Sequence, residues 1–312
     1  MATLDSLPLE ILSFILASFC VHCCDPHQKV PATFFHIGTT AEQQRQEGQQ
    51  RHEEKQDGRL PVGNFLGRQA LYSMCLVSTK FRDLAQPILY HVLVPRSTNG
   101  RVWSRCLTAF LRTVVRRPDL AALVRRIVFG INLGVIRDGD ARLVLEEATR
   151  ARGTQLADFL RSFWESYPRG DLEEMRLANC DQLTVMLLAS LPNLTSVVFS
   201  NGLLVPNIPK SALRATGVLT LPLQTVEIFG GMGDRIVVLS DLLNIASSTL
   251  STINVASGGF GLLGTLASYL PGLRNLCITN SNLRDWGLGV ILSRCEALES
   301  FIFEAGTFPI CH

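Results

Sequence analysis

Residues 20–27 read CVHCCDPH and place three cysteines and two histidines within eight positions. Cys20 and Cys23 have the C-x-x-C spacing of a zinc-binding pair. A closed zinc site usually draws on a second pair of ligands, but the next candidates here are the isolated His52 and Cys75. Cysteines that follow an apolar helix are more often small buried side chains. We therefore expect no metal site.

Residues 259–264, GFGLLG, have the G-x-G-x-x-G spacing of a loop that approaches a pyrophosphate, and Asp285 follows 21 residues later. In a dinucleotide site the acidic residue closes the next strand, where this sequence has Asn280. The neighbouring strand–helix segments match this one but lack its glycines. A turn that requires positive φ is enough to explain why glycine occurs here. We therefore expect no nucleotide and no other cofactor.

The sequence lacks the residue patterns of a nucleophilic enzyme. No G-x-S-x-G segment occurs, and no histidine falls within the repeated segments described below. A general base there would have to be a carboxylate or a lysine. We therefore expect no catalytic residue and no enzymatic activity.

Five arginines between residues 112 and 126 raise the possibility of phosphate contacts. They alternate with apolar residues, no aromatic platform accompanies them, and the net charge of the chain is only +2. We therefore expect a solvated helix face and no nucleic-acid partner. The arginines are Arg112, Arg116, Arg117, Arg125 and Arg126.

Length and composition indicate a protein of two units that can bury most of itself. The chain has 312 residues, 47% of them hydrophobic and 18% charged. The apolar stretch 11–24 has no basic segment before it and is shorter than the ~20 residues of a membrane span. Nine cysteines without a dense framework favour reduced thiols. We expect a cytoplasmic or nuclear protein that is neither secreted nor bound to a membrane.

Apolar periodicity predicts helices in the first half. Pro8 suits the first turn of a helix whose apolar residues recur up to Phe19. Residues 42–59 hold no large apolar residue and predict a mobile loop. Periodicity returns in 71–94, where Pro87 should end one helix and begin another. Further helices are predicted from about Trp103 to just before Pro118 and across 141–166.

The second half contains a repeat whose copies begin 22, 29, 27, 23 and 25 residues apart. In each copy three apolar side chains would point inward from a short strand, while the alternate residues point outward. Burial of three side chains gives roughly 5–9 kcal/mol, against on the order of 40 kcal/mol for ordering ~25 residues. The copies must therefore stack, and this period is the signature of leucine-rich repeats. The copies are LEEMRLANC (172–180), LTSVVF (194–199), LQTVEI (223–228), LSTINV (250–255), LRNLCI (273–278) and LESFIF (298–303), with VRRIVF (124–129) as an irregular earlier copy.

The segments LDSLPLEILSFIL (4–16) and LVSTKFRDLAQPILYHVL (76–93) resemble the two halves of an F-box. The family pattern is a Leu-Pro-x-Glu-Ile/Leu opening helix followed by a helix with Leu-Val-Ser-x-x-Phe-Arg and a trailing Pro-x-Leu-Tyr. This resemblance covers about the first 94 residues. The run FLRTVVRRPDLAALVRRIVF (110–129) and the repeats behind it look like fungal F-box proteins with irregular leucine-rich repeats. About 50 residues separate the two halves. Each doubling of the loop length adds only ~0.6 kcal/mol to the entropy cost of closing the loop, so we expect the two halves still to pack together.

The resemblance implies a substrate-recognition adaptor of a cullin–RING ubiquitin ligase. The F-box would dock on the linker subunit of the ligase, and the repeats would capture a protein substrate. The alternative is a leucine-rich-repeat interaction module that acts outside any ligase. Linker-subunit contacts are expected from Leu7, Pro8, Ile11, Leu76, Val77 and Phe81, and substrate contacts from Arg176, Glu227, Phe229, Asn254 and Asn275.

We therefore predict an α/β chain with a helical F-box and an irregular repeat solenoid that carries a short parallel sheet. The F-box would span 1–94 with a disordered insertion at about 20–69. A helical linker with an irregular first repeat would span 95–170, and the repeats 171–312. Because the chain stops just after the last predicted strand, where Phe301 and Phe303 would lie near an open end, we expect a solenoid without its C-terminal cap.

Overall fold

The computed structural model describes residues 7–20, 23, 62–94, 100–129, 139–165, 172–200, 208–232, 239–258, 272–281, 289 and 292–305. The chain divides into two compact units, Met1–Leu89 (unit 1) and Tyr90–His312 (unit 2). The predicted mobile loop at 42–59 and the GFGLLG segment lie outside the described residues.

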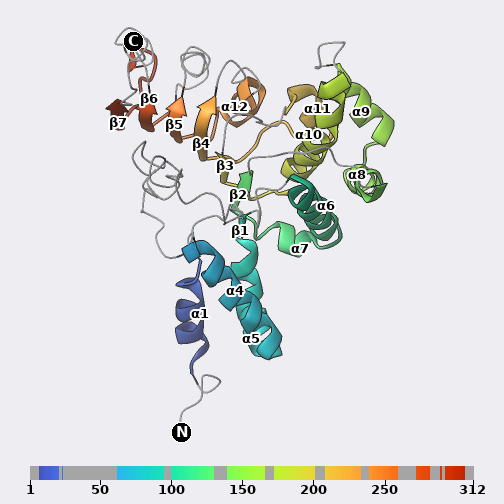
Figure 1. Ribbon diagram of the computed structural model, residues 1–312, viewed down its shortest axis with the longest axis vertical. Helices are drawn as coiled ribbons and strands as arrows, with labels where there is room; N and C mark the ends of the chain where they lie inside the picture. The colour runs from blue at the N-terminus through green and yellow to red at the C-terminus, as the bar shows by residue number, and fades with distance from the viewer. Residues whose placement is uncertain are drawn as a thin grey trace, which may run out of the picture. The chain divides into compact units, whose positions relative to one another are not determined.

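Unit 1 contains the helices α1 (Leu9–Ala17), α4 (Val62–Val77) and α5 (Thr79–Tyr90, whose last residue belongs to unit 2), seen at the blue end of the chain in Figure 1. Its core is small. Leu16 of α1, Leu71 of α4 and Ala85 of α5 form one buried cluster, against which partly buried side chains of α4 and α5 pack. The segments on either side of the long insertion therefore do pack together, as predicted.

The break between α4 and α5 lies at Ser78, so the prediction that Pro87 divides two helices was wrong. The Ser78 hydroxyl accepts a hydrogen bond of 3.2 Å from the backbone N–H of Phe81, which is the geometry of a helix N-cap. Pro87 lies inside α5, where it removes one backbone donor near the end of the helix. The cap thus decides where the new helix begins. Residues 62–69, predicted as part of the insertion, belong to α4.

Unit 2 is built on a seven-stranded parallel sheet in which every strand pairs with the next strand along the chain. This confirms an α/β chain with a parallel sheet. The order runs from β1 to β7 without a reversal, whereas dinucleotide-binding sheets have a switch point where the order reverses. The strands are β1 (Val92–Leu93), β2 (Arg126–Phe129), β3 (Ser196–Ser200), β4 (Thr225–Met232), β5 (Thr252–Gly258), β6 (Asn275–Ser281) and β7 (Ser300–Ala305).

The same hydrogen-bond pattern recurs at the start of each strand. One carbonyl oxygen accepts bonds of 2.8–3.0 Å from two consecutive N–H groups at the beginning of the next strand. The carbonyls belong to His91, Arg125, Thr195, Gln224, Ser251 and Arg274. Because the pattern is unchanged from β1 to β7, the strands stay in register although the chain between them varies in length.

Five of the six predicted repeat copies form β3 to β7, and the irregular copy at 124–129 forms β2. The prediction of a repeat copy at 172–180 was wrong, because these residues belong to the helix α10 (Leu172–Ser190). Residues 172–183 contain no β-branched residue and many strong helix formers, whereas the true strands are rich in Val, Ile and Thr. β1 was not predicted, since two residues carry no periodicity.

The three inward positions of the copies that form β3 to β6 belong to the core of unit 2. In the copy that forms β4 they are Leu223, Val226 and Ile228, all with no exposed surface, and the equivalent residues of the copies that form β3, β5 and β6 are also buried. They form one cluster with side chains of the helices, including Leu183 of α10 and Leu213 of α11. Alternation along the strands thus gives one apolar row after another against the helices.

The helices of unit 2 follow the predicted periodicity with one break. The helix predicted from about Trp103 is α6 (Gly100–Arg116), and Trp103, Leu107, Leu111 and Val114 form its buried face. The stretch predicted across 141–166 is two helices, separated where Gly153 adopts a φ of 70°. The helices are α6 (Gly100–Arg116), α7 (Pro118–Ala121), α8 (Gly139–Ala151), α9 (Leu156–Trp164), α10, α11 (Lys210–Ala215) and α12 (Ser240–Ala246).

Within the part of the chain that the structure describes, no helix combines the length and the apolar character needed to cross a membrane.

Ile253 and Phe301 occupy the same inward row but differ in burial, which gives a matched test of the core. Ile253 is fully buried, whereas Phe301 is 37% exposed. We expect Ile253→Ala to lower the free energy of unfolding by about 2–5 kcal/mol, because it leaves a cavity. Phe301→Ala removes a larger side chain but should cost less, because the site is open to water. Urea unfolding of the full chain measures both, and a larger loss for Phe301→Ala would contradict the assignment of the core.

Candidate functional sites

Unit 1 exposes several of the apolar side chains that the sequence assigns to a partner. Leu76 and Val77, at the end of α4, are 70% and 65% exposed, and Ile11 of α1 is 49% exposed. Pro8 is also exposed and Leu7 is half-buried. Phe81 differs, because only 4% of it is exposed. The structure thus divides the six predicted residues into a core side chain, Phe81, and five that a partner can reach.

Further exposed apolar side chains of unit 1 were not singled out from the sequence. Phe14 is the most exposed large apolar residue of α1, on the side of the helix away from Leu12 and Leu16, and Leu9 is exposed as well. Tyr72 is exposed on α4, one turn before Leu76. The sequence could have identified them from the spacing of the buried residues. An apolar side chain that does not follow this helical spacing points away from the core. We call Leu9, Ile11, Phe14, Tyr72, Leu76 and Val77 the apolar surface of unit 1.

Helix α4 approaches the chain after α1 closely at Gly67. A Cβ atom added to Gly67 would lie 2.5 Å from the carbonyl oxygen of Phe19. The absence of a side chain therefore sets the distance at which α4 packs against the end of α1.

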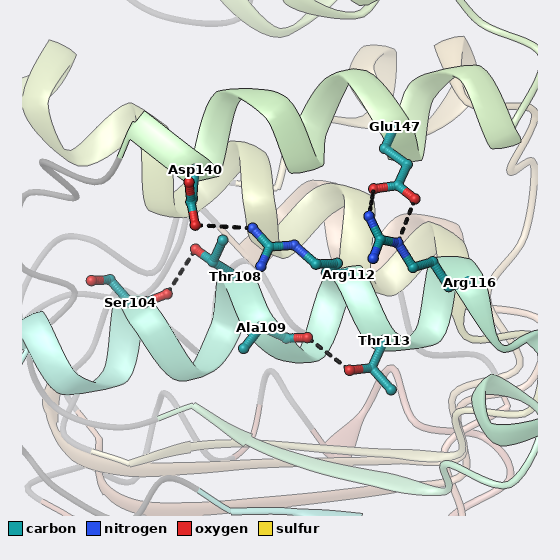
Figure 2. Close-up of polar contacts among 8 residues, drawn as sticks. All are labelled: Ser104, Thr108, Ala109, Arg112, Thr113, Arg116, Asp140 and Glu147. Carbon is teal, nitrogen blue, oxygen red and sulfur yellow. Dashed lines mark hydrogen bonds and ion pairs between the residues drawn. The ribbon is translucent and has the colours of Figure 1, made fainter.

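The arginines of α6 are paired with acidic residues of α8, as Figure 2 shows. Arg116 binds both carboxylate oxygens of Glu147, at 2.7 and 3.0 Å, and Arg112 pairs with Asp140 at 3.1 Å. The hydrogen bond from Arg116 and its charge lower the pKa of the Glu147 carboxyl. These pairs are exposed, as expected of a solvated helix face. Their positive charge is offset locally rather than offered to an anion.

The same prediction was wrong for Arg125 and Arg126, because Arg125 directly precedes β2 and Arg126 is its first residue. The Arg126 side chain is 14% exposed and pairs with Glu227 of β4 at 2.9 Å between Nη2 and Oε1. Alternation along a strand turns Arg126 away from the inward row of Ile127, so it points to the opposite face of the sheet.

That opposite face, which we call the outer strand face, carries the alternate residues of the strands. Three of its apolar members, Val128, Val198 and Phe229, are buried but do not belong to the main cluster of unit 2. The face consists of Arg126, Val128, Ser196, Val198, Thr225, Glu227, Phe229, Thr252, Asn254, Ala256, Asn275, Cys277 and Thr279.

The structure brings four of the five predicted substrate-binding residues to the outer strand face. Asn254 and Asn275 are half-buried there, and the Asn275 amide donates a hydrogen bond of 3.3 Å to the Thr252 hydroxyl. Glu227 and Phe229 lie on the same face but are buried. Arg176 does not belong to it, because its segment is part of α10.

Glu227 is the most strongly buried charged group on this face, with 3% of the residue exposed. Burial raises the pKa of the Glu227 carboxyl, and it outweighs the charge and the hydrogen bond of Arg126, which act in the opposite direction. Two hydroxyls of the outer strand face, on Ser196 and Thr279, are buried and have no hydrogen-bond partner among the residues that the structure describes. Sequence reasoning found Glu227 but missed its pairing with Arg126, since 101 residues separate them.

Only Cys20 and Cys23 of the CVHCCDPH segment lie within the described residues. Cys20 is buried, and the Cys23 N–H donates a hydrogen bond of 3.0 Å to its carbonyl. The buried thiol agrees with a small apolar residue after a helix. The expectation of no metal site stays a prediction.

The chain was compared with protein-family models, with curated protein sequences and with solved structures, and none of the three comparisons gave a match.

Gly67→Ala should weaken the packing of α4 on the end of α1, because the added methyl group would overlap the Phe19 carbonyl. We expect faster hydrogen exchange of the α1 amides and a loss of about 1–3 kcal/mol in the stability of unit 1. Gly289→Ala is the matched control, since a Cβ atom there meets no neighbour within 4 Å. Equal exchange rates in the two variants would show that the close approach is unimportant.

Glu227→Gln should change how stability depends on pH. Because the pKa of Glu227 is raised above its ordinary value of 4.5, the folded wild-type chain holds this proton more tightly than the unfolded chain. Glu227 therefore favours folding below pH 4.5 and loses that contribution as pH rises through its folded pKa. The stability of wild type minus that of Glu227→Gln should fall with pH, by at most ~1.4 kcal/mol per unit. Urea unfolding from acid to neutral pH measures it, and a difference that rises with pH would refute the direction.

Proposed function

We propose that the chain is a substrate-recognition adaptor of a cullin–RING ubiquitin ligase. In this proposal unit 1 is an F-box that binds the linker subunit, and unit 2 is an irregular leucine-rich-repeat solenoid that captures a protein substrate. The observation that carries the proposal is the apolar surface of unit 1, because side chains at the F-box-like positions Ile11, Leu76 and Val77 are exposed on a unit with a very small core.

An exposed set of apolar side chains on a small helical unit normally marks a partner. Burying Leu76 and Val77 contributes roughly 3–6 kcal/mol, at ~1.5–3 kcal/mol for each side chain. This is less than most estimates of the ~4–15 kcal/mol that association costs. Further contacts are therefore needed, and the other members of the apolar surface of unit 1 can provide them, namely Leu9, Ile11, Phe14 and Tyr72. Phe81 acts in the core of the F-box rather than in the contact.

The solenoid proposal is supported by the order of the strands and by their spacing. From β3 to β7, residues in the same row of the sheet are 29, 27, 23 and 25 residues apart, which lies in the range of leucine-rich repeats. At the beginning of each strand from β2 to β7, two consecutive N–H groups donate to one carbonyl oxygen of the residue just before the preceding strand, so every strand begins in the same way. A larger interval of 70 residues between β2 and β3 holds α8, α9 and α10, which makes the solenoid irregular.

The adaptor performs no bond chemistry in this proposal. The outer strand face offers side chains that bind rather than react, and its buried carboxyl, Glu227, is held by Arg126. The alternative function is an interaction module that works outside any ligase. It would use the outer strand face in the same way and leave unit 1 without a ligase partner.

The full chain should co-purify with the linker subunit of a cullin–RING ligase, and the double variant Leu76→Gln, Val77→Gln should not. Replacing both side chains removes apolar contact but keeps residues that tolerate a helix, so affinity should fall at least tenfold. Isothermal titration calorimetry with purified linker subunit measures the change.

Leu143→Gln is the control, because Leu143 is a similarly exposed leucine on α8 of unit 2 and should have no effect. Binding that survives in the double variant would refute the assigned surface. A wild-type chain that does not bind the linker subunit at all would refute the adaptor function and favour the alternative.

A further inference from the structure

We propose that the outer strand face binds an acidic peptide segment, with a carboxylate of that segment held by Arg126. The inference rests on the proposed function in one respect, that unit 2 is the part of the chain that captures the substrate. It adds the chemistry of the substrate and the residue at the centre of the contact.

The geometry of the ion pair places Arg126 across the sheet. In register, Arg126 of β2 lies beside Ser196 of β3, which lies beside Thr225 of β4, and Glu227 is two residues further along β4. Neighbouring strands are ~4.8 Å apart, so β2 and β4 are separated by ~10 Å. The Arg126 side chain must therefore pass over β3 to reach Glu227 at 2.9 Å. Its apolar stem covers β3, which fits the complete burial of Val198.

Arg126 is the member of the pair that a ligand meets first. Its side chain is 14% exposed and that of Glu227 only 4%. The ion pair includes a contact of 2.9 Å between the guanidinium nitrogen Nη2 and the carboxylate oxygen Oε1. A guanidinium has five N–H donors in a planar fork, so it can hold a second carboxylate while it remains paired with the first.

The rest of the same row also offers donors. The Ser196 hydroxyl is buried and has no hydrogen-bond partner in the described part of the chain. The Thr252 hydroxyl oxygen already accepts a bond from Asn275, which directs its own hydrogen to another acceptor. Arg126, Ser196 and Thr252 therefore favour a ligand rich in oxygen acceptors, such as carboxylates and backbone carbonyls.

The length of this row indicates the size of the segment. From Arg126 on β2 to Ser300 on β7 there are five strand-to-strand steps, which is ~24 Å. An extended peptide advances ~3.3 Å per residue, so about seven residues cross this part of the row. A basic segment fits less well, because its ammonium or guanidinium groups would meet Arg126 before Glu227.

The experiment uses the full chain and three fluorescein-labelled Gly-Ser octapeptides that carry two glutamates, two glutamines or two lysines. Fluorescence anisotropy measures binding of each peptide. The glutamate peptide should bind at least tenfold more tightly than the other two. Arg126→Gln should remove this preference. Arg274→Gln, which replaces an exposed arginine just before β6, should leave it unchanged.

Glu227→Gln gives a second, independent outcome. It keeps the shape of the buried side chain but no longer neutralises Arg126, so it should strengthen binding of the glutamate peptide severalfold. This arm decides the question if Arg126→Gln does not fold. Failure of Glu227→Gln to strengthen binding, equal binding of the glutamate and glutamine peptides, tighter binding of the lysine peptide, or no binding of any peptide would each overturn the proposal.

The result is independent of the ligase assignment. Arg126→Gln should bind the linker subunit like the wild-type chain, because Arg126 belongs to unit 2. If the wild-type chain does not bind the linker subunit but prefers the glutamate peptide, the adaptor function alone is refuted. Linker binding without a glutamate preference would refute the peptide assignment alone.

Discussion

Unit 2 depends on one constraint, which is that the segments of β2 to β6 each place three apolar side chains in the core, at the same height as their neighbours. In the segment of β4 these are Leu223, two residues before the strand, Val226 and Ile228, none of which retains exposed surface. The carbonyl that accepts two N–H groups at the start of each strand fixes the height. Because the two features recur together, a single strand is stabilised mainly by the strands on either side of it. The outer strand face follows from the same constraint, since it receives the alternate residues.

Much of this arrangement could be predicted from the sequence, because it depends on the local periodicity of apolar residues. The strands β3 to β7 and the buried face of α6 were found from apolar spacing alone. The α/β character and the parallel sheet followed from the repeat. The outward direction of Glu227 and Asn254 followed from alternation along a strand, which needs no knowledge of distant residues.

The features that the sequence did not reveal are of two kinds. Some depend on which of two local preferences is stronger, and others depend on contacts between residues that are far apart in the sequence. The segment 172–180 has the leucine spacing of a strand, but its helix-forming residues decide its structure. Pro87 is a strong helix breaker in general, yet the cap made by Ser78 sets the boundary. The exposure of Leu76 and the burial of Phe81 depend on how three helices pack. The pair of Arg126 with Glu227 joins residues from separate turns of the sheet. No local pattern contains such information.

The uneven intervals between strands have a consequence for how the chain can vary. Residues in one row of the sheet are separated by as many as 70 positions between β2 and β3 and by as few as 23 between β5 and β6, yet the row is continuous. Since each strand bonds only to its neighbours in chain order, extra residues between two strands do not change which strands pair. Insertions can thus change what surrounds the strands without altering the pattern of side chains that the sheet displays, so the two can evolve separately.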